Sequence, residues 1–185
     1  MIHTLQFLGG FMRSEQKYSL AMRSLHWLVF LAVTIAVVAI EIHDFFPKGS
    51  TARTAAFAVH QTAGLSVLAL MVLRLFVRWG TQPPAPVPGP QLLQRAACLT
   101  HGVLYLLMVG MPILGVLALA WGGKPIQPFG LTLTLPLLQD KSLASLSKEV
   151  HESGATLVYI FVGLHAAAAL WHEFMLKDRL LRRMI

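Results

Sequence analysis

The chain has 185 residues, of which 56% are hydrophobic and only 12% are charged, about half the charged share of an average soluble domain. It carries 15 Lys and Arg against 8 Asp and Glu, for a net charge of +7. This composition excludes a disordered chain, and it excludes a nucleic-acid-binding protein because the basic residues are sparse and separated by long apolar runs. The single cysteine, Cys98, excludes a disulfide framework, a Cys-rich zinc site, an iron–sulfur cluster held by this chain alone and covalent haem attachment. We expect Cys98 to fill a small core position.

Four stretches without Asp, Glu, Lys or Arg follow one another along the chain. They are residues 24–40, 54–73, 96–123 and 153–172, with lengths of 17, 20, 28 and 20 residues. A helix needs about 20 residues to cross the apolar core of a bilayer. Backbone groups in lipid must be hydrogen-bonded within the span, which favours helices. The sequence therefore predicts an all-α integral membrane protein, a four-helix transmembrane bundle in the lipid bilayer.

The segments between these stretches contain residues that end helices. Residues 45–50 read Phe-Phe-Pro-Lys-Gly-Ser, and residues 81–90 contain five prolines. The longest predicted loop covers residues 122–148, where three prolines argue against a fifth span. The expected organisation is an N-terminal tail over residues 1–22, a four-helix domain over residues 23–176 and a short basic tail over residues 177–185.

Lys and Arg are distributed unevenly between the two sides of the predicted bundle. Ten lie on the side that carries both termini and five on the opposite side, so the positive-inside rule predicts both termini in the cytoplasm. With the acidic residues counted, the whole net charge of +7 belongs to the cytoplasmic side. No basic residue precedes the first apolar stretch, as a secretory signal peptide would require. We expect residues 1–11 to be a start-site extension before Met12.

Ionisable side chains within a membrane span are costly, so each histidine there is a functional candidate, although a lone histidine can also simply hydrogen-bond a neighbouring helix. His151 and His165 lie 14 residues apart, which puts them on one face of the fourth helix, about 21 Å apart. His60 enters the second helix near its external end, and His26 enters the first near its cytoplasmic end. Pairs of His60 with His151 and of His26 with His165 are therefore possible at two depths, the inner one with some helix tilt.

Histidine pairs that face each other inside a helical bundle can ligate haem iron. Iron with two imidazole ligands has no open position for oxygen, so it passes electrons. Zinc is the competing metal, but it usually takes a third or fourth protein ligand close by, so a pair at each depth favours haem. Arg74 follows His60 by 14 residues and shares its helix face at the depth of the inner pair, where its guanidinium could hold haem propionates. The alternative is an arginine that extends to the interface.

The remaining histidines carry weaker signals. His101 and His172 lie near the cytoplasmic ends of the third and fourth helices, within reach of a propionate or a quinone carbonyl, but interfacial histidines often have no role and we assign them none. His43, in the external turn, and His3, in the N-terminal tail, are expected to be solvated. Four tryptophans near helix ends fit the aromatic belt of membrane proteins: Trp27, Trp79, Trp121 and Trp171.

Several of these residues stand in motifs that resemble the bacterial cytochrome b561 family. The motifs are Ser24-Leu25-His26-Trp27, Phe45-Phe46-Pro47-Lys48, His151-Glu152, the alanine-rich block Gly163-Leu164-His165-Ala166-Ala167-Ala168-Ala169-Leu170, and Lys177-Asp178. The resemblance covers residues 18–183. It implies a four-helix bundle that holds two non-covalent haem b groups in an inner membrane. His26 and His165 match the ligands of the cytoplasmic-side haem in this family, and His60 and His151 match those of the external one.

The resemblance also implies a function in electron transport. Members of this family pass electrons between a periplasmic donor, proposed to be superoxide for some, and membrane quinone, so ubiquinone is the expected acceptor. The chain departs from the family pattern in its longer N-terminus and in its compressed tail after Asp178. Two alternatives remain open: a cytochrome b membrane-anchor subunit that relays electrons for a dehydrogenase or hydrogenase, and a small transporter that uses histidines for protons or metal.

Overall fold

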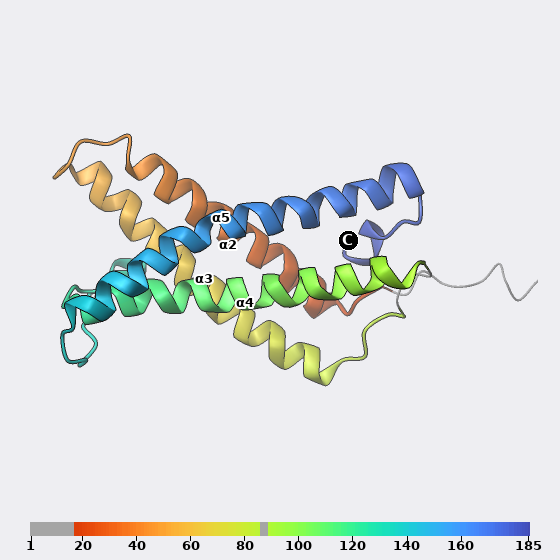
Figure 1. The fold of residues 1–185 in the computed structure, drawn as a ribbon, viewed down its shortest axis with the longest axis horizontal. Helices are drawn as coiled ribbons and strands as arrows, with labels where there is room; N and C mark the ends of the chain where they lie inside the picture. Colours follow the sequence, from red (N-terminus) through yellow and green to blue (C-terminus); the bar gives the residue numbers. More distant parts are fainter. Residues whose placement is uncertain (1–16, 86–88) are drawn as a thin grey trace, which may run out of the picture.

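The computed structural model describes residues 17–85 and 89–185, and these residues form two antiparallel helical hairpins that cross each other (Figure 1). The first hairpin joins α2 (Leu20–His43) to α3 (Thr51–Gly80), and the second joins α4 (Gln91–Trp121) to α5 (Lys141–Trp171). Within the described residues these four helices are each long and apolar enough to cross a membrane. The predicted all-α, four-span architecture is confirmed, and α2 begins within the expected tail 1–22, whose first sixteen residues lie outside the described part.

Side-chain caps determine where three of the helices begin. The hydroxyl of Ser19 accepts a hydrogen bond from the backbone N–H of Met22 at the start of α2, and Ser50 accepts one from Arg53 at the start of α3. Asp140 accepts from the N–H groups of Ser142 and Leu143 at 2.8 and 3.0 Å, which satisfies donors that α5 leaves unpaired.

The fourth helix is longer than the charge-free stretch that predicted it, toward the end of the bundle opposite the C-terminal segment, which we call the external end after the predicted orientation. α5 begins at Lys141, so the external loop ends at Asp140 and the expected loop over residues 122–148 is too long. Lys148 and Glu152 form an ion pair one helical turn apart, at 3.4 Å. The absence of charge marks the part of a helix that lies in lipid, whereas the helix itself extends beyond it.

The external loop after α4 is fastened to α3 beside His60. It contains a short helix, η1 (Pro128–Gly130). The backbone N–H of Gln127 donates to Oε1 of Gln61 at 2.6 Å, and that of Phe129 donates to the hydroxyl of Thr62 at 3.0 Å. The loop is therefore held against α3 at the level of His60.

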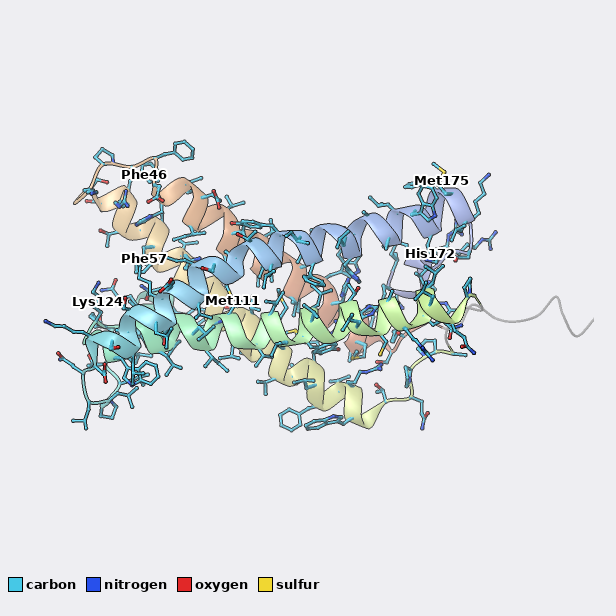
Figure 2. The ribbon with its side chains drawn as sticks, in the orientation of Figure 1. Phe46, Phe57, Met111, Lys124, His172 and Met175 are labelled. Carbon is cyan, nitrogen blue, oxygen red and sulfur yellow. The ribbon has the colours of Figure 1, made fainter. Side chains whose placement is uncertain are left out.

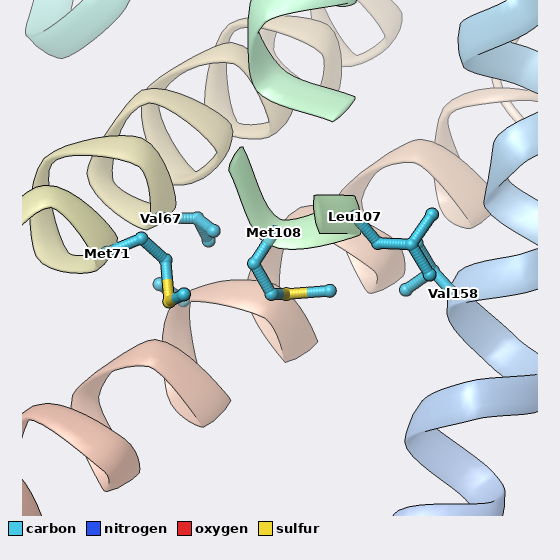
Figure 3. Close-up of a cluster of buried hydrophobic side chains, with 6 residues drawn as sticks. Val67, Met71, Leu107, Met108 and Val158 are labelled. Carbon is cyan, nitrogen blue, oxygen red and sulfur yellow. The ribbon is translucent and has the colours of Figure 1, made fainter. Parts of the chain in front are cut away.

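A buried apolar cluster joins the two hairpins at the middle of the bundle (Figure 3). Its members come from all four helices: Ala32, Val67, Met71, Leu107, Met108 and Val158. Val67 lies seven residues from both His60 and Arg74, and Val158 lies seven residues from both His151 and His165. Because seven residues are about two helical turns, the cluster separates the two histidine levels.

The chain after α5 folds back toward the start of α2 (Figure 1). It continues as η2 (His172–Leu176), reverses at Lys177 and Arg179, which adopt positive φ angles of 55° and 58°, and ends with η3 (Leu181–Arg183). The N–H of Tyr18 donates to the carbonyl of Arg183 at 3.1 Å. The C-terminal segment is thus packed against the N-terminal turn of the first hairpin.

Candidate functional site

Two histidines meet near the external end of the bundle, and we call His60 of α3 and His151 of α5 the outer pair. Their ring centroids are 6.0 Å apart and their planes are at 84°. Figure 2 shows Phe57 and Met111, neighbours of this pair, toward the end of the molecule that carries Lys124, whereas His172 lies near the opposite end. The structure brings together the two residues that the helical spacing placed at one depth.

Both rings of the outer pair are oriented by backbone carbonyls of other helices. Nδ1 of His60 hydrogen-bonds the carbonyl of Ala36 in α2 at 2.9 Å, and Nδ1 of His151 hydrogen-bonds the carbonyl of Met111 in α4 at 2.8 Å. A carbonyl oxygen can only accept, so each Nδ1 carries the proton. Each Nε2 then keeps its lone pair, which is the arrangement of a neutral imidazole metal ligand.

Glycine lets α4 approach the outer pair closely. A Cβ on Gly115 would lie 3.1 Å from Cε1 and 3.4 Å from Nδ1 of His151. Gly154 of α5 is similarly close to α4, since a Cβ there would lie 2.5 Å from the sulfur of Met111, whose carbonyl orients His151. Because these two positions carry no side chain, there is room for the ring of His151 beside Gly115 and for the side chain of Met111 beside Gly154.

A second group of histidines meets near the other end of the bundle, and we call His26 of α2 and His165 of α5 the inner pair. Their ring centroids are 6.1 Å apart at 68°, so the inner pair is as close as the outer pair despite the tilt that its depths required. The ring of His101 lies even closer to His165, at 5.3 Å. Its Nδ1 donates to the carbonyl of Ala97 at 2.7 Å. His101, to which the sequence analysis assigned no role, therefore lies beside the inner pair.

The separation within each pair fits coordination of one metal ion between two imidazoles. Metal–nitrogen bonds of about 2 Å on opposite sides of an ion place two imidazole centres about 6 Å apart. In the described parts of the chain, no group of three or more His, Cys, Asp and Glu side chains is arranged to hold a metal. Two facing imidazoles leave the other coordination positions of the ion to a non-protein ligand. A porphyrin supplies four nitrogens in one plane.

Arg74 lies at the inner end of the bundle, as its spacing from His60 predicted. Its Nη1 donates to the carbonyl of Met22 at 3.2 Å, and its Nε donates to the hydroxyl of Tyr105 at 3.3 Å. These bonds hold the guanidinium between α2, α3 and α4, at the level of the first turn of α2. A cation there is suited to the carboxylates of a cofactor beside the inner pair.

The other candidates lie outside the two pairs. His172 hydrogen-bonds Asp178 in the C-terminal segment. His43 hydrogen-bonds Asp44 at 3.0 Å, and its ring lies 5.7 Å from that of Phe57. Its side chain is 19% exposed, so it is only partly solvated. Cys98 is exposed, which corrects its expected core position.

Sequence reasoning missed the groups that orient the pairs. The carbonyls of Ala36 and Met111 have no side-chain signature, and their position opposite a histidine depends on how neighbouring helices are rotated. Tyr105 carries a weak signal, as a hydroxyl within an apolar stretch. Gly115 carries another, as a glycine in a span, but many glycines in spans pack only against lipid or helix.

The chain is similar to known membrane cytochromes over most of its length. A family model described as prokaryotic cytochrome b561 matches residues 17–185. Cytochrome b561 homolog 1 of Escherichia coli (strain K12) is 35% identical over 162 residues, which cover 87% of this chain and 92% of that protein. The Yersinia pestis protein named Probable superoxide oxidase CybB is 36% identical over 173 residues, 92% of this chain and 97% of its own length. Cytochrome b561 homolog 2 of Escherichia coli (strain K12) is 27% identical over 187 residues, 95% of either chain.

Proposed function

Since this chain belongs to the prokaryotic cytochrome b561 family, and is therefore a b-type cytochrome of electron transport, we propose that it binds two haem b groups and carries electrons across the membrane between them. The outer pair, His60 and His151, would hold one haem, and the inner pair, His26 and His165, the other. Both pairs have ring centroids about as far apart as two ligands of one ion require. That observation is the one that carries the proposal.

The chain's own residues would supply two histidine ligands to each of two haem groups. Haem iron between two imidazoles supplies one-electron transfer without an open position for a further ligand. The carbonyls of Ala36 and Met111 hold the outer rings in the tautomer that ligates. The apolar cluster between the two levels, which includes Val67 and Val158, excludes water from the centre of the bundle.

We propose that electrons enter at the external side and leave to membrane ubiquinone, in a bacterial inner membrane with both chain termini in the cytoplasm. The distribution of Lys and Arg supports this orientation. The relative named Probable superoxide oxidase CybB supports superoxide as the periplasmic donor. Two superoxide ions would each lose one electron and become O₂, and one quinone would take up both electrons with two protons. Arg53, a cation on the external side, is already bonded to Asp44 at 2.8 Å, so steering of an anion there is weak.

Arg74 provides a test of the inner site. We expect Arg74→Gln to keep both haems and to lower the reduction potential of one of them by roughly tens of millivolts, because a nearby cation favours the reduced, more electron-rich form. Redox titration of the purified variant measures this shift. Arg78→Gln is the matched control, since Arg78 is exposed one turn further along α3. An equal shift in both variants would contradict a specific contact of Arg74 with the inner haem.

The proposed function as a whole is tested by a reduced-minus-oxidised spectrum together with a haem assay on the purified protein. We expect a b-type spectrum and two haems per chain, and oxidation of the reduced protein by a short-chain ubiquinone. A colourless protein would support the transporter alternative, and one haem per chain would contradict the two-site arrangement. Purification with a stoichiometric soluble dehydrogenase or hydrogenase would support the membrane-anchor alternative.

A further inference from the structure

The first helix and the C-terminal segment enclose a groove that the proposed electron path does not use. The groove has a volume of about 540 Å³ and lies between α2 and the last residues of the chain. Its lining combines an apolar wall with one cation: Leu20, Leu28, Leu31, Trp27, Met184 and Arg23. It therefore joins a hydrophobic surface to a single positive charge.

Specific hydrogen bonds hold the two walls of this groove together. The indole N–H of Trp27 donates to the carbonyl of Met184 at 2.8 Å, and Nζ of Lys17 donates to the carbonyl of Ile185 at 3.2 Å. Leu28 and Leu31 are 48% and 54% exposed, although they belong to a helix that spans the membrane. Side chains of this kind face acyl chains in a bilayer, so the groove opens toward lipid.

Arg23, which lines this groove, has a donor without a partner. Its Nε is buried and has no hydrogen-bond partner among the described residues. A guanidinium stays charged at any physiological pH, and a buried donor without a partner is costly. In the C-terminal segment, Asp178 hydrogen-bonds His172, and Glu173 pairs with Arg182 through Oε1 while its buried Oε2 has no hydrogen-bond partner. Neither acidic residue is among the described residues that line the groove, so the lining itself provides no carboxylate side chain for Arg23.

We propose that the groove binds one anionic phospholipid, with its phosphate at Arg23 and its acyl chains along Leu28 and Leu31. The position of Arg23 in the first turn of α2, one turn before Trp27, is the headgroup level of a span with an aromatic belt. This end of the bundle carries the excess of Lys and Arg, which attracts anionic lipids. A ubiquinone has the same apolar tail but no charge to pair with Arg23, so the charge favours the phospholipid.

The bound lipid would connect the C-terminal segment to the inner pair. Trp27 contacts both the groove and His26, whose ring centroid is 5.4 Å from that of the indole. A lipid in the groove would therefore stabilise the packing of Met184 against α2 beside a proposed haem ligand. This contact is the route by which loss of the lipid would loosen the C-terminal segment.

Native mass spectrometry of the haem-loaded, full-length protein tests this proposal with phosphatidylglycerol and phosphatidylcholine as probes. We expect one phosphatidylglycerol to be retained per chain and phosphatidylcholine to bind at least about fivefold more weakly. Arg23→Gln should weaken phosphatidylglycerol about five- to tenfold, since it removes one lipid-pairing charge. Arg78→Gln, which removes an exposed cation at the same end, should leave the affinity unchanged, and Arg23→Lys should retain most of it.

Three outcomes would overturn the proposal. They are equal retention of the two lipids, equal phosphatidylglycerol affinity in Arg23→Gln and Arg78→Gln, and displacement of phosphatidylglycerol by short-chain ubiquinone, which would assign the groove to quinone. If Arg23→Gln fails to retain haem, Leu28→Trp is the variant to test instead, because its larger side chain fills the groove without removing a charge. Unchanged phosphatidylglycerol binding in Leu28→Trp would then contradict the site. These results do not depend on electron transfer, so they are distinguishable from a failure of the proposed function.

Discussion

Replacing either histidine of the outer pair with alanine is expected to halve the haem content and to remove the same haem in both cases. His60→Ala and His151→Ala each leave a single imidazole, so the outer haem would lose one of its two proposed iron ligands and the binding free energy which that bond contributes. The inner haem should remain, because the apolar cluster and about 21 Å of helix separate the two levels. The haem assay gives the stoichiometry, and the residual reduced-minus-oxidised spectrum identifies which haem is left.

Variants of the inner pair should show the complementary loss. His26→Ala and His165→Ala are expected to lose the haem that survives in the outer variants. His101→Ala is expected to keep both, although its ring is 5.3 Å from that of His165, since the sequence motif assigns the ligand role to His26. Loss of the inner haem in His101→Ala together with its retention in His26→Ala would reassign that ligand.

His43→Ala is the control for these substitutions. His43 lies at the external end, close to the outer pair, and its ring is 5.7 Å from that of Phe57, but it belongs to neither pair. Both haems should be retained. Loss of both haems from every single variant, His43→Ala included, would leave the pairing unsupported, because disruption of the whole bundle would explain it.

The second large effect is expected from a residue with no functional side chain. Gly115→Leu should abolish binding of the outer haem, because even a Cβ at this position would lie 3.1 Å from the ring of His151 and a leucine would displace the ring from Met111 and from His60. Gly115→Ala should produce a weaker version of the same change, seen as an altered spectrum with both haems retained. Spectra and haem stoichiometry of the purified variants measure both effects.

The matched control is Gly110→Leu on the same helix. A Cβ at Gly110 has nothing within 4 Å, so this variant introduces the same side chain into α4 without touching a histidine. Both haems should be retained. If Gly110→Leu and Gly115→Leu lost haem equally, the cause would be a general effect of leucine on α4, and the close contact of Gly115 with His151 would have no special role.

The sequence alone predicts the spans because the signal for a span is local. The stretches without charge identified four helices that the structure contains, since most residues in lipid are apolar and backbone groups there are bonded within their own helix. The same locality explains the error in the external loop. α5 starts at Lys141, where Asp140 caps it, and its first turns include charged residues outside lipid. A search for stretches without charge therefore does not detect this part of the helix.

The depth of each histidine also follows from the sequence. The 14-residue intervals from His151 to His165 and from His60 to Arg74 set one helix face and about 21 Å of height by helix geometry alone. The sequence predicts that the inner pair meets only with some helix tilt, and the structure places the ring centroids of His26 and His165 6.1 Å apart.

Only the tertiary structure determines what surrounds these histidines. The rotation of α2 and α4 about their own axes decides that the carbonyls of Ala36 and Met111 receive the outer Nδ1 protons. The same rotation turns Gly115 toward His151 and His101 toward His165. The periodicity of a single helix shows which residues share a face, but the direction of that face depends on packing against the other helices. The sequence therefore determined which residues form the candidate site and at what depth they lie. Helix packing decided how the histidine rings are oriented and which carbonyls and glycines contact them.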